Sequence, residues 1–385
     1  MTQQIAADQL TTSADEDGVR ALRAPLVDFN RIPMGIQGDA LAVHSAHEVY
    51  ELLVGLWAPA IIEAAHDLGV FAELRLGAAA ATGVSSALGT DTQATRVLLD
   101  ALHVYGLLDR TGSERTGHTY ALPSHLAEVS TNEGAFSLVG KFLHDRHVAW
   151  PAWRGLAETV RHGAHRADGG WSENQISSHD YLALAKGISF WAPPVVELLS
   201  HELQVLGWDV DGPRRMLDVG CGTGIYTHLL LGRFPTWRGL GFDVEDVVGL
   251  ASTTAHEYGV ADRFSPMNGD FWSTPWPAEQ DLVFFGNIFH LEPRGRAQQL
   301  ARLASDALAD DGLVVIVDQI RVGDTERESA QDRFAVLFAA SMLATGGGDT
   351  YRLAEYDRWL RDAGLARVSL VDAPMHRILI ARHSR

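Results

Sequence analysis

The sequence predicts a doubly wound α/β domain in its second half, preceded by a mainly helical domain. Three observations support this fold class. From Arg215 onward, short apolar stretches alternate with segments of helical periodicity, as in a parallel sheet covered by helices. The first of these stretches runs into a turn with three glycines. In the first third of the chain, helical segments precede two short segments that can form a hairpin, which is the order of a winged helix.

Composition limits the classes of function. The chain has 385 residues, enough for two or three domains at ~150 residues each. Its net charge of −18 argues against a nucleic-acid partner, because binding to phosphates draws on Lys and Arg. The single cysteine, Cys221, rules out an internal disulfide and fits a reducing compartment. We find no signal-like start and no apolar run near the ~18–20 residues that span a bilayer, so we expect a cytoplasmic protein without a membrane partner.

Changes in periodicity divide the chain into four predicted parts. These are an N-terminal arm (1–40), a winged-helix domain (41–125), a helical linker and lid region (126–206) and the α/β domain (207–385). A winged helix can bind DNA or hold subunits together. Its candidate recognition helix, Asp91–Tyr105, carries Arg96 as its only Lys or Arg. We therefore predict a dimerisation module and a homodimer rather than a DNA-binding regulator.

The region between the two domains is rich in aromatic side chains. Gly134–Gly163 has helical periodicity and carries His144 and His147 three residues apart. Without further ligands at fixed spacing, a core or pocket position is favoured over a metal pair, and no metal is predicted. A second helical stretch, Tyr181–Leu206, should break at its two prolines. The candidates to line an aromatic substrate pocket are His144, Phe190, Trp191, Phe338 and Met342.

Seven segments of the second half are predicted strands. They are Arg215–Val219, Leu240–Phe242, Phe264–Met267, Leu282–Phe285, Leu313–Asp318, Ala366–Val371 and Ile378–Ala381. The last two are separated by a short turn and should form an antiparallel hairpin.

The turn after the first strand has glycines at 220, 222 and 224. Ile225 occupies the place of the third glycine of a dinucleotide fingerprint, and no Lys-Ser or Lys-Thr pair follows as in a phosphate-binding loop. A nucleoside without phosphates is the remaining common ligand, and an ordinary tight turn is the alternative. Cys221 lies inside this turn but has no basic neighbour in sequence, so a nucleophilic role is disfavoured.

Polar residues also end the next three strands. Asp243 can accept both hydroxyls of a ribose. Asp270 can accept from an adenine amino group while Phe271 packs on the ring. Asn287 opens the segment that leads to His290. Each Asp taken singly could equally be a helix N-cap.

These segments resemble a known family. Leu217–Gly224, Gly241–Asp243, Gly269–Phe271 and Asn287–His290 are similar to the motifs of S-adenosylmethionine-dependent class I methyltransferases. The resemblance covers roughly residues 41–382 and is strongest to small-molecule O-methyltransferases of plant phenolic and bacterial natural-product pathways. It implies a Rossmann-like seven-stranded methyltransferase sheet with an antiparallel last strand, an N-terminal winged-helix dimerisation domain, and residues 207–385 as the catalytic domain.

The resemblance also implies roles for single residues. His290 would be the general base and Asp318 its acidic partner. The residues expected to bind S-adenosylmethionine are Asp218, Gly220, Gly222, Gly224, Asp243, Val244, Asp270, Phe271 and Asn287.

Two departures from the family keep alternatives open. The family usually has Asp-Trp after the histidine, where this chain has Leu291-Glu292. Thr350 falls near the place of a second acidic residue. We expect methylation of an oxygen on an aromatic or polyketide-like small molecule. Transfer to carbon or nitrogen, and a related enzyme that binds the cofactor without transferring its methyl group, are the alternatives.

Overall fold

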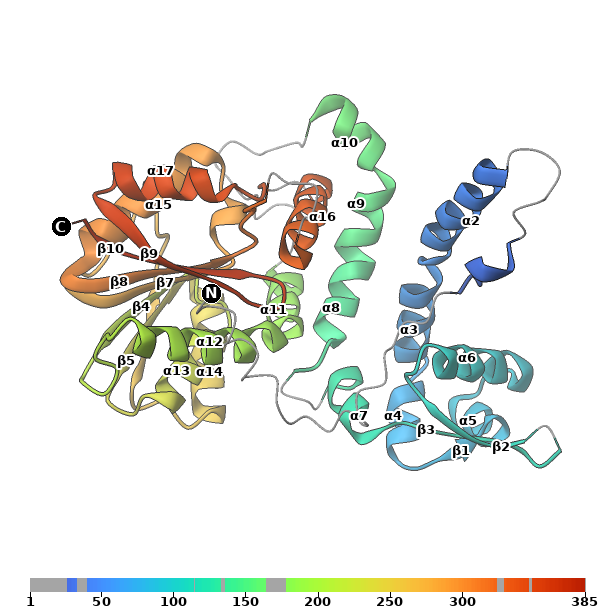
Figure 1. Ribbon diagram of the computed structural model, residues 1–385. Coiled ribbons are helices and arrows are strands. Elements are labelled where there is room, and N and C mark those ends of the chain that lie inside the picture. The colour runs from blue at the N-terminus through green and yellow to red at the C-terminus, as the bar shows by residue number, and fades with distance from the viewer. Residues whose placement is uncertain are drawn as a thin grey trace. The chain divides into compact units, whose positions relative to one another are not determined.

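The computed structural model describes residues 26–32, 40–113, 115–132, 136–163, 178–323, 329–345 and 348–384. The chain divides into two compact units, Met1–Ser137 and Leu138–Arg385 (Figure 1). Most of the predicted N-terminal arm lies outside the described residues. The four-part division of the chain stays a prediction.

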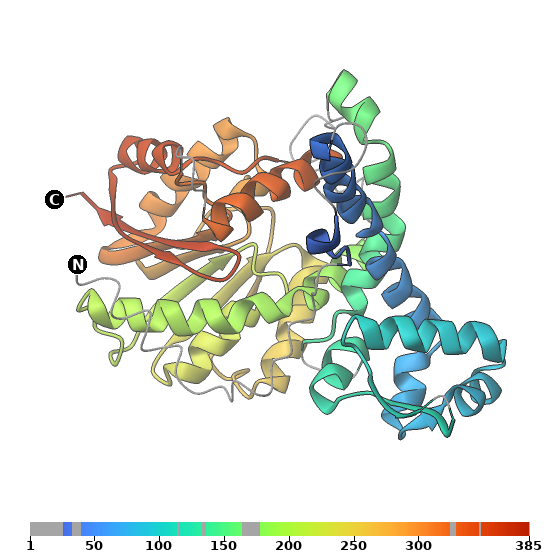
Figure 2. The same cartoon turned by 45° about the vertical axis from the view of Figure 1, so that its right-hand side comes forward.

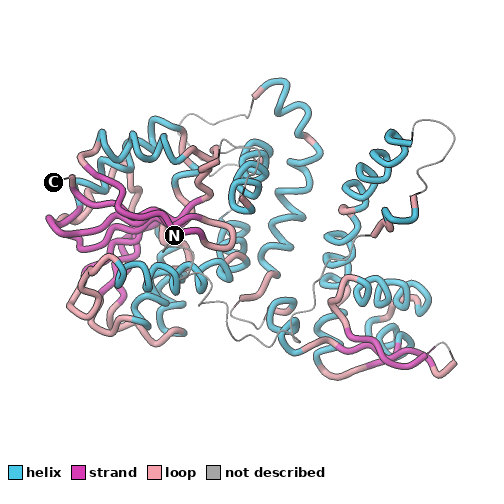
Figure 3. The backbone as a smooth tube through the Cα atoms, viewed as in Figure 1, coloured by secondary structure: helices cyan, strands magenta, loops and turns pink. Residues whose placement is uncertain are grey.

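The first unit is mainly helical and holds a small sheet. Its helices are η1 (Phe29–Arg31), α2 (Ala40–Val54), α3 (Trp57–Asp67), α4 (Val70–Arg75), α5 (Ala81–Leu88), α6 (Thr92–Val104) and α7 (Ser124–Ser130). The strands β1 (Ala79–Ala80), β2 (Asp109–Ser113) and β3 (Gly117–Ala121) pair in the order β1-β3-β2 (Figure 3). The predicted helices and hairpin are therefore present. Asp91 caps α6 by accepting from the backbone N–H of Ala94 at 2.8 Å.

The basic side chain of the candidate recognition helix is engaged within its own unit. Asp100 accepts from Arg96 and from Arg110, both at 2.7 Å, and from the hydroxyl of Tyr120, also at 2.7 Å. Two of the cations on this face are thus paired with one carboxylate. The absence of a nucleic-acid partner stays a prediction.

The second unit is built on a seven-stranded sheet of order β6-β5-β4-β7-β8-β10-β9. Its strands are β4 (Arg215–Val219), β5 (Arg238–Asp243), β6 (Phe264–Asn268), β7 (Gln280–Gly286), β8 (Leu308–Asp318), β9 (Leu365–Asp372) and β10 (Arg377–His383). β4 to β8 pair in parallel, whereas β10 runs antiparallel to β8 and β9. This confirms the predicted sheet with its antiparallel end.

Helices cover both faces of this sheet (Figure 2). One buried cluster joins the sheet to α12 (Ala192–Val205), α13 (Ile225–Arg233) and α14 (Glu245–Glu257). The opposite cluster joins it to α15 (Arg294–Ala307) and α17 (Leu353–Asp362). Because β4, β7 and β8 are covered on both faces, most of their residues are buried. The strands' carboxyl ends form the edge at which polar residues can gather.

The predicted helical stretch over 134–163 is present from Val139 to His162 and contains one π-helical turn. It comprises α8 (Val139–His144), the π-helical turn η2 (Asp145–Ala149), α9 (Trp150–Arg154) and α10 (Leu156–His162). The second stretch divides into α11 (Ser178–Gly187), η3 (Ser189–Trp191) and α12, with prolines in the first turn of α12. Proline is tolerated in a first turn because its missing N–H has no partner there. A further helix, α16 (Ala330–Ala344), precedes α17.

Two helical stretches bear on the expectation that the protein has no membrane partner. Within the described residues, two helical stretches, Leu41–Asp67 and Tyr181–Val205, are long and apolar enough to cross a bilayer by length and composition alone. Polar residues are interspersed in both stretches, which is why no unbroken apolar run stands out in the sequence. Each stretch is also interrupted, between α2 and α3 and at η3. The absence of a membrane partner stays a prediction.

Candidate active site

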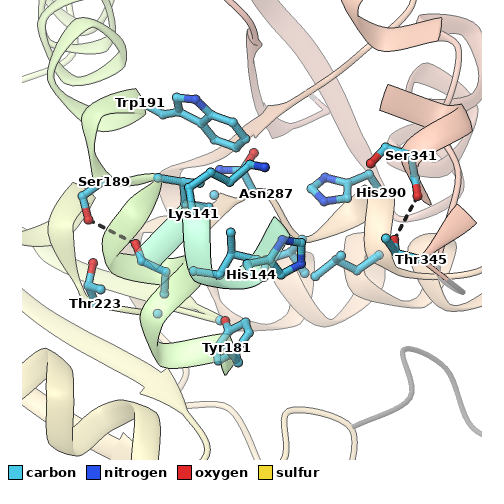
Figure 4. A pocket seen from close by; sticks show the side chains of 18 of the residues that line it. Lys141, His144, Tyr181, Ser189, Trp191, Thr223, Asn287, His290, Ser341 and Thr345 are labelled. Carbon is cyan, nitrogen blue, oxygen red and sulfur yellow. Dashed lines mark hydrogen bonds between the residues drawn. The ribbon is translucent and has the colours of Figure 1, made fainter. Parts of the chain in front are cut away.

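A cavity of about 250 Å³ opens at the carboxyl ends of β4 and β7 in the second unit. Its walls come from the glycine turn, from the segment after β7, and from α8, η2, α11 and α16. Figure 4 shows side chains from these separate elements converging on one space. Most of the walls are apolar, with Trp191, Phe338 and Met342 among them.

The glycine turn brings backbone, not side chains, to the cavity. Gly220, Gly222 and Gly224 have φ of 69°, 56° and 72°, a region that favours glycine. A Cβ on Gly220 would collide with the side chain of Ile288, whereas a Cβ on Gly222 would meet nothing within 4 Å. Gly220 and Gly222 line the cavity, and Gly224 begins α13. A ligand can therefore approach the backbone closely at Gly222.

Asp243 holds this turn in place. Its Oδ2 accepts from the N–H of Gly222 at 3.0 Å and its Oδ1 from the N–H of Val244 at 2.8 Å. Burial raises the pKa of Asp243 in spite of these two bonds. Asp270 is exposed and accepts from the N–H of Trp272 at 3.0 Å, while Phe271 packs edge-on against the core. These four predicted residues, Val244 included, do not line the cavity, and their cofactor roles stay predictions.

Asp218 presents a buried carboxyl group to the cavity. It is the next-to-last residue of β4 and is 2% exposed. The hydroxyl of Thr227 donates to its Oδ2 at 2.6 Å. Burial raises its pKa to about 7, an effect that the Thr227 hydrogen bond opposes and the neighbouring Asp243 reinforces. A cation placed beside Asp218 would favour its ionised form.

His290 lies at the other side of the cavity with Asp318 behind it. The Nδ1 atom of His290 is 2.8 Å from Oδ1 of Asp318, and the backbone N–H of His290 donates to Oδ2 at 3.0 Å. Asp318 is fully buried and His290 is 4% exposed. Phe338 of α16 stands edge-on to the imidazole, with ring centroids 4.9 Å apart. The orientation of the imidazole is thus fixed, and its Nε2 atom is available to a ligand in the cavity.

The predicted substrate residues divide into two groups. His144, Trp191, Phe338 and Met342 line the cavity, as do Asn287 and His290. Phe190 does not, and its side chain is 39% exposed. Thr350 is fully buried, and its hydroxyl donates to the carbonyl of Ala335 at 3.0 Å, so it offers no acidic or basic group to His290.

Several lining residues escaped the sequence-based prediction. Lys141 and Asp145 form an ion pair one turn apart on the helix that carries His144. Their (i, i+4) spacing is a signal that could have been used. Burial by itself would raise the pKa of the Asp145 carboxyl group. The contacts with His144 and Lys141 outweigh this effect, so the pKa lies below its ordinary value. Tyr181 reaches the cavity from α11, where no sequence signal singled it out. Among the described residues, no three His, Cys, Asp or Glu side chains gather to hold a metal ion.

Comparisons with known proteins cover both units. The O-methyltransferase domain matches residues 196–366, and the O-methyltransferase dimerisation domain matches residues 50–128. The 3-hydroxy-5-methyl-1-naphthoate 3-O-methyltransferase of Streptomyces sahachiroi is 27% identical over 83% of this chain and 90% of its own. The mitomycin biosynthesis 6-O-methyltransferase of Streptomyces lavendulae is 26% identical over 85% of this chain and 91% of its own.

Solved structures share the fold. Human N-acetylserotonin methyltransferase in complex with SAM superposes with a TM-score of 0.74 at 19% identity, over 91% of this chain and 100% of its own. CalO1, a methyltransferase in calicheamicin biosynthesis in its SAH-bound form, gives 0.67 at 20% identity, over 89% and 99%. With two domains of one enzyme family matched side by side and relatives aligned over most of their length, we conclude that this chain belongs to the S-adenosylmethionine-dependent O-methyltransferases.

Proposed function

We propose that this enzyme methylates a hydroxyl group of an aromatic or polyketide-like small molecule, with His290 as general base and Asp318 as its partner. The observation that carries the proposal is the buried His290–Asp318 pair, at 2.8 Å, in the wall of an otherwise largely apolar cavity. The resemblance of Asn287–His290 to the family motif supports it. The named acceptors of the relatives, a hydroxynaphthoate and mitomycin, suggest the substrate class.

The residues at the glycine turn fit S-adenosylmethionine. Open space beside Gly222, where a Cβ would project, lets the backbone approach a ligand. Asp218 supplies a carboxylate for a cationic group, and we propose that Gly220, Gly222, Gly224 and Asp218 hold the methionine end. By the family resemblance, Asp243 would hold the sugar, Asp270 and Phe271 would hold the adenine, and Val244 would also contact the cofactor. When bound, the cofactor supplies a methyl group that is already electrophilic on a charged sulfur.

The protein must then align the acceptor oxygen, exclude water and accept a proton. Nδ1 of His290 faces a carboxylate, so the proton of the neutral ring resides on Nδ1 and Nε2 can accept. A phenol has a pKa near ~10 and an unperturbed histidine near ~6.5, so complete proton transfer before the attack is unfavourable. The proton moves to Nε2 as the oxygen–methyl bond forms and makes the hydroxyl more acidic. The carboxylate of Asp318 stabilises the imidazolium that results. His144, Trp191, Phe338 and Met342 would surround the aromatic part.

The direct test is His290→Ala, assayed with labelled S-adenosylmethionine against a panel of phenols that begins with a hydroxynaphthoate. We expect turnover to fall by the ~10²–10⁴-fold typical of a general base. The affinity for S-adenosylhomocysteine, measured by calorimetry, should be unchanged. The matched control is His256→Ala, an exposed histidine of α14, which should behave as wild type. Near-normal turnover in His290→Ala would refute the assignment of the base.

Transfer to nitrogen or carbon is the second candidate. The position of Thr350, buried and bonded to a backbone carbonyl, leaves His290 without a second acidic partner, which favours this alternative. Relatives include the phenazine-1-carboxylate N-methyltransferase of Pseudomonas aeruginosa, 24% identical over 88% of this chain and 97% of its own. Carbon-13 NMR of the product after turnover with a labelled methyl group distinguishes O-, N- and C-methyl carbons. Conversion of substrate without release of S-adenosylhomocysteine would instead indicate that no methyl group is transferred.

The dimerisation domain supports a homodimer. Light scattering of the full chain tests this directly, and a monomer at micromolar concentration would contradict it. The cytoplasmic location and the absence of a nucleic-acid partner stay predictions.

A further inference from the structure

Asn287 has a strained backbone at the edge of the cavity. Its φ is +64°, and among the described non-glycine residues only Glu279 shares a positive φ. Its backbone N–H donates to the carbonyl of Val317 at 2.9 Å, which ties the turn to β8. A left-handed conformation costs a non-glycine residue free energy, although Asn tolerates it better than most. A glycine would remove that cost, so the amide side chain needs another explanation.

The side-chain amide of Asn287 is held from three directions. Its Oδ1 accepts from Nε2 of His376 at 2.8 Å and from Nε2 of Gln319 at 3.3 Å. Its Nδ2 donates to the hydroxyl of Tyr226 at 3.3 Å. Both donors to the oxygen are themselves buried, His376 and Gln319 each being 2% exposed. The amide therefore has one orientation, with its oxygen turned into the protein.

His376 is well suited to fix that orientation. It lies in the turn between β9 and β10, and its ring meets Trp191 edge-on with centroids 4.9 Å apart. Burial lowers the pKa of His376 to about 4, so the ring is neutral at physiological pH. With an acceptor opposite Nε2, its single ring proton resides there. The carbonyl of Asn287 is thus saturated by donors, and only an N–H is left for a ligand.

That N–H lies where the chemistry is proposed to occur. Asn287 and His290 are three residues apart on the segment after β7, and both line the cavity. In Figure 4 the amide of Asn287 projects into the space between Trp191 and His290. An N–H donor is repelled by a positive sulfur but stabilises an oxygen that is losing its proton. This distinguishes an acceptor-side role from the cofactor-binding role that the family resemblance implies.

We propose that Asn287 donates its second amide N–H to the acceptor oxygen of the substrate, and that His376 is the positioning residue that holds it there. The inference rests on the proposed function. In the step, the hydroxyl proton passes to Nε2 of His290, the oxygen–methyl bond forms, and the carbon–sulfur electron pair stays on sulfur. Asn287 transfers nothing; it stabilises the negative charge that develops on the oxygen.

Two substitutions at position 287 separate this role from a structural one. Asn287→Gly relieves the backbone strain, so the protein should fold while losing the donor. Asn287→Asp keeps the shape and the acceptor for His376, but it places a carboxylate beside the reacting oxygen. With a hydroxynaphthoate as acceptor, we expect kcat/KM to fall by ~10²–10³ in Asn287→Gly, as for loss of one oxyanion donor, and further in Asn287→Asp. A merely structural role would leave Asn287→Asp near wild type.

The positioning role is tested by a rescue. His376→Leu removes the donor to Asn287 and should lower kcat about tenfold, whereas His376→Gln keeps an N–H donor and should recover most of the loss. The affinity for S-adenosylhomocysteine should stay within about twofold in all four variants, by calorimetry. If that affinity falls in parallel with kcat, Asn287 belongs to the cofactor site and the inference is refuted. If the wild type methylates no phenol of the panel, the proposed O-methyltransferase function is refuted. If the wild type is active and Asn287→Asp is equally active, the proposed function stands and only the role of Asn287 is refuted.

Discussion

Replacing Arg377 with Met should destabilise the fold and, at the same time, disturb the wall of the cavity that α16 forms. The guanidinium is 3% exposed and holds both oxygens of Asp332, at 2.7 and 3.2 Å. It also donates to the hydroxyl of Ser329, the N-cap of α16, at 2.8 Å, and to the carbonyl of Ile320. Arg377 begins β10, so this cluster fastens α16 to the sheet. α16 carries Phe338, whose ring stands edge-on to the imidazole of His290.

The magnitude follows from what the substitution leaves behind. Asp332 would stay buried, 5% exposed, with the N–H of Val322 and the hydroxyl of Ser329 as its remaining donors. Breaking a buried pair by removing one partner costs about 3–5 kcal/mol. The control is Asp372→Asn, which removes only the outer carboxylate of Arg377, itself 58% exposed. Such an exposed partner contributes less than about 1 kcal/mol.

The assay is urea unfolding of both variants and the wild type at pH 7 and pH 3. Burial by itself would raise the pKa of the Asp332 carboxyl group. Arg377 and the neighbouring hydrogen-bond donors outweigh this effect and hold the pKa well below its ordinary value. A depressed carboxyl pKa contributes stability above the unfolded pKa, near ~3.9, and this is lost as the pH falls toward the folded value. The difference in the free energy of unfolding between the wild type and Arg377→Met should therefore be smaller at pH 3 than at pH 7. A loss below about 1 kcal/mol at pH 7, or a difference that does not change with pH, would refute the reasoning.

Three further outcomes are expected. Asp318→Asn should lower kcat by ~10²-fold or more and leave the affinity for S-adenosylhomocysteine unchanged. An amide cannot accept from both His290 N–H groups and stabilise the imidazolium. Turnover equal to that of the wild type would show that the carboxylate is dispensable. Asp218→Asn should flatten the pH dependence of the melting temperature of the ligand-free protein between about pH 4 and pH 7, that is, between the unfolded carboxyl pKa near ~3.9 and the folded value. A raised carboxyl pKa, here about 7, means that stability from this group is present at low pH and is lost as the pH rises, so an unchanged slope would exclude Asp218 as its source. Gly140→Ala should raise KM for the acceptor. The Cβ atom of the new alanine would overlap the backbone of α11 and push α11 away from α8. Gly155→Ala, whose nearest atom is 3.5 Å away, is the control, and equal KM values in both would count against a constrained helix crossing.

The sequence alone determined the order of elements in both units. The boundaries of the predicted strand Arg215–Val219 agree with the structure to the residue. They are readable because apolar runs, glycines and proline act over a few neighbours, and local geometry imposes their spacing. The identity of the glycine turn, and with it the family, also depends on residues that are adjacent in the chain. The helical periodicity across 134–163 is likewise confirmed over Val139–His162, although it does not reveal the π-helical turn at Asp145–Ala149.

Tertiary structure decided which side chains meet. His290 and Asp318 are 28 residues apart, and their contact depends on β7 and β8 being neighbours in the sheet. His376 lies 89 residues beyond Asn287 and reaches it only because β10 returns antiparallel beside β8. Phe190 and Trp191 are adjacent and equally aromatic, yet only the second lines the cavity. Pairings of this kind are set by the packing of distant segments, which no short-range pattern encodes.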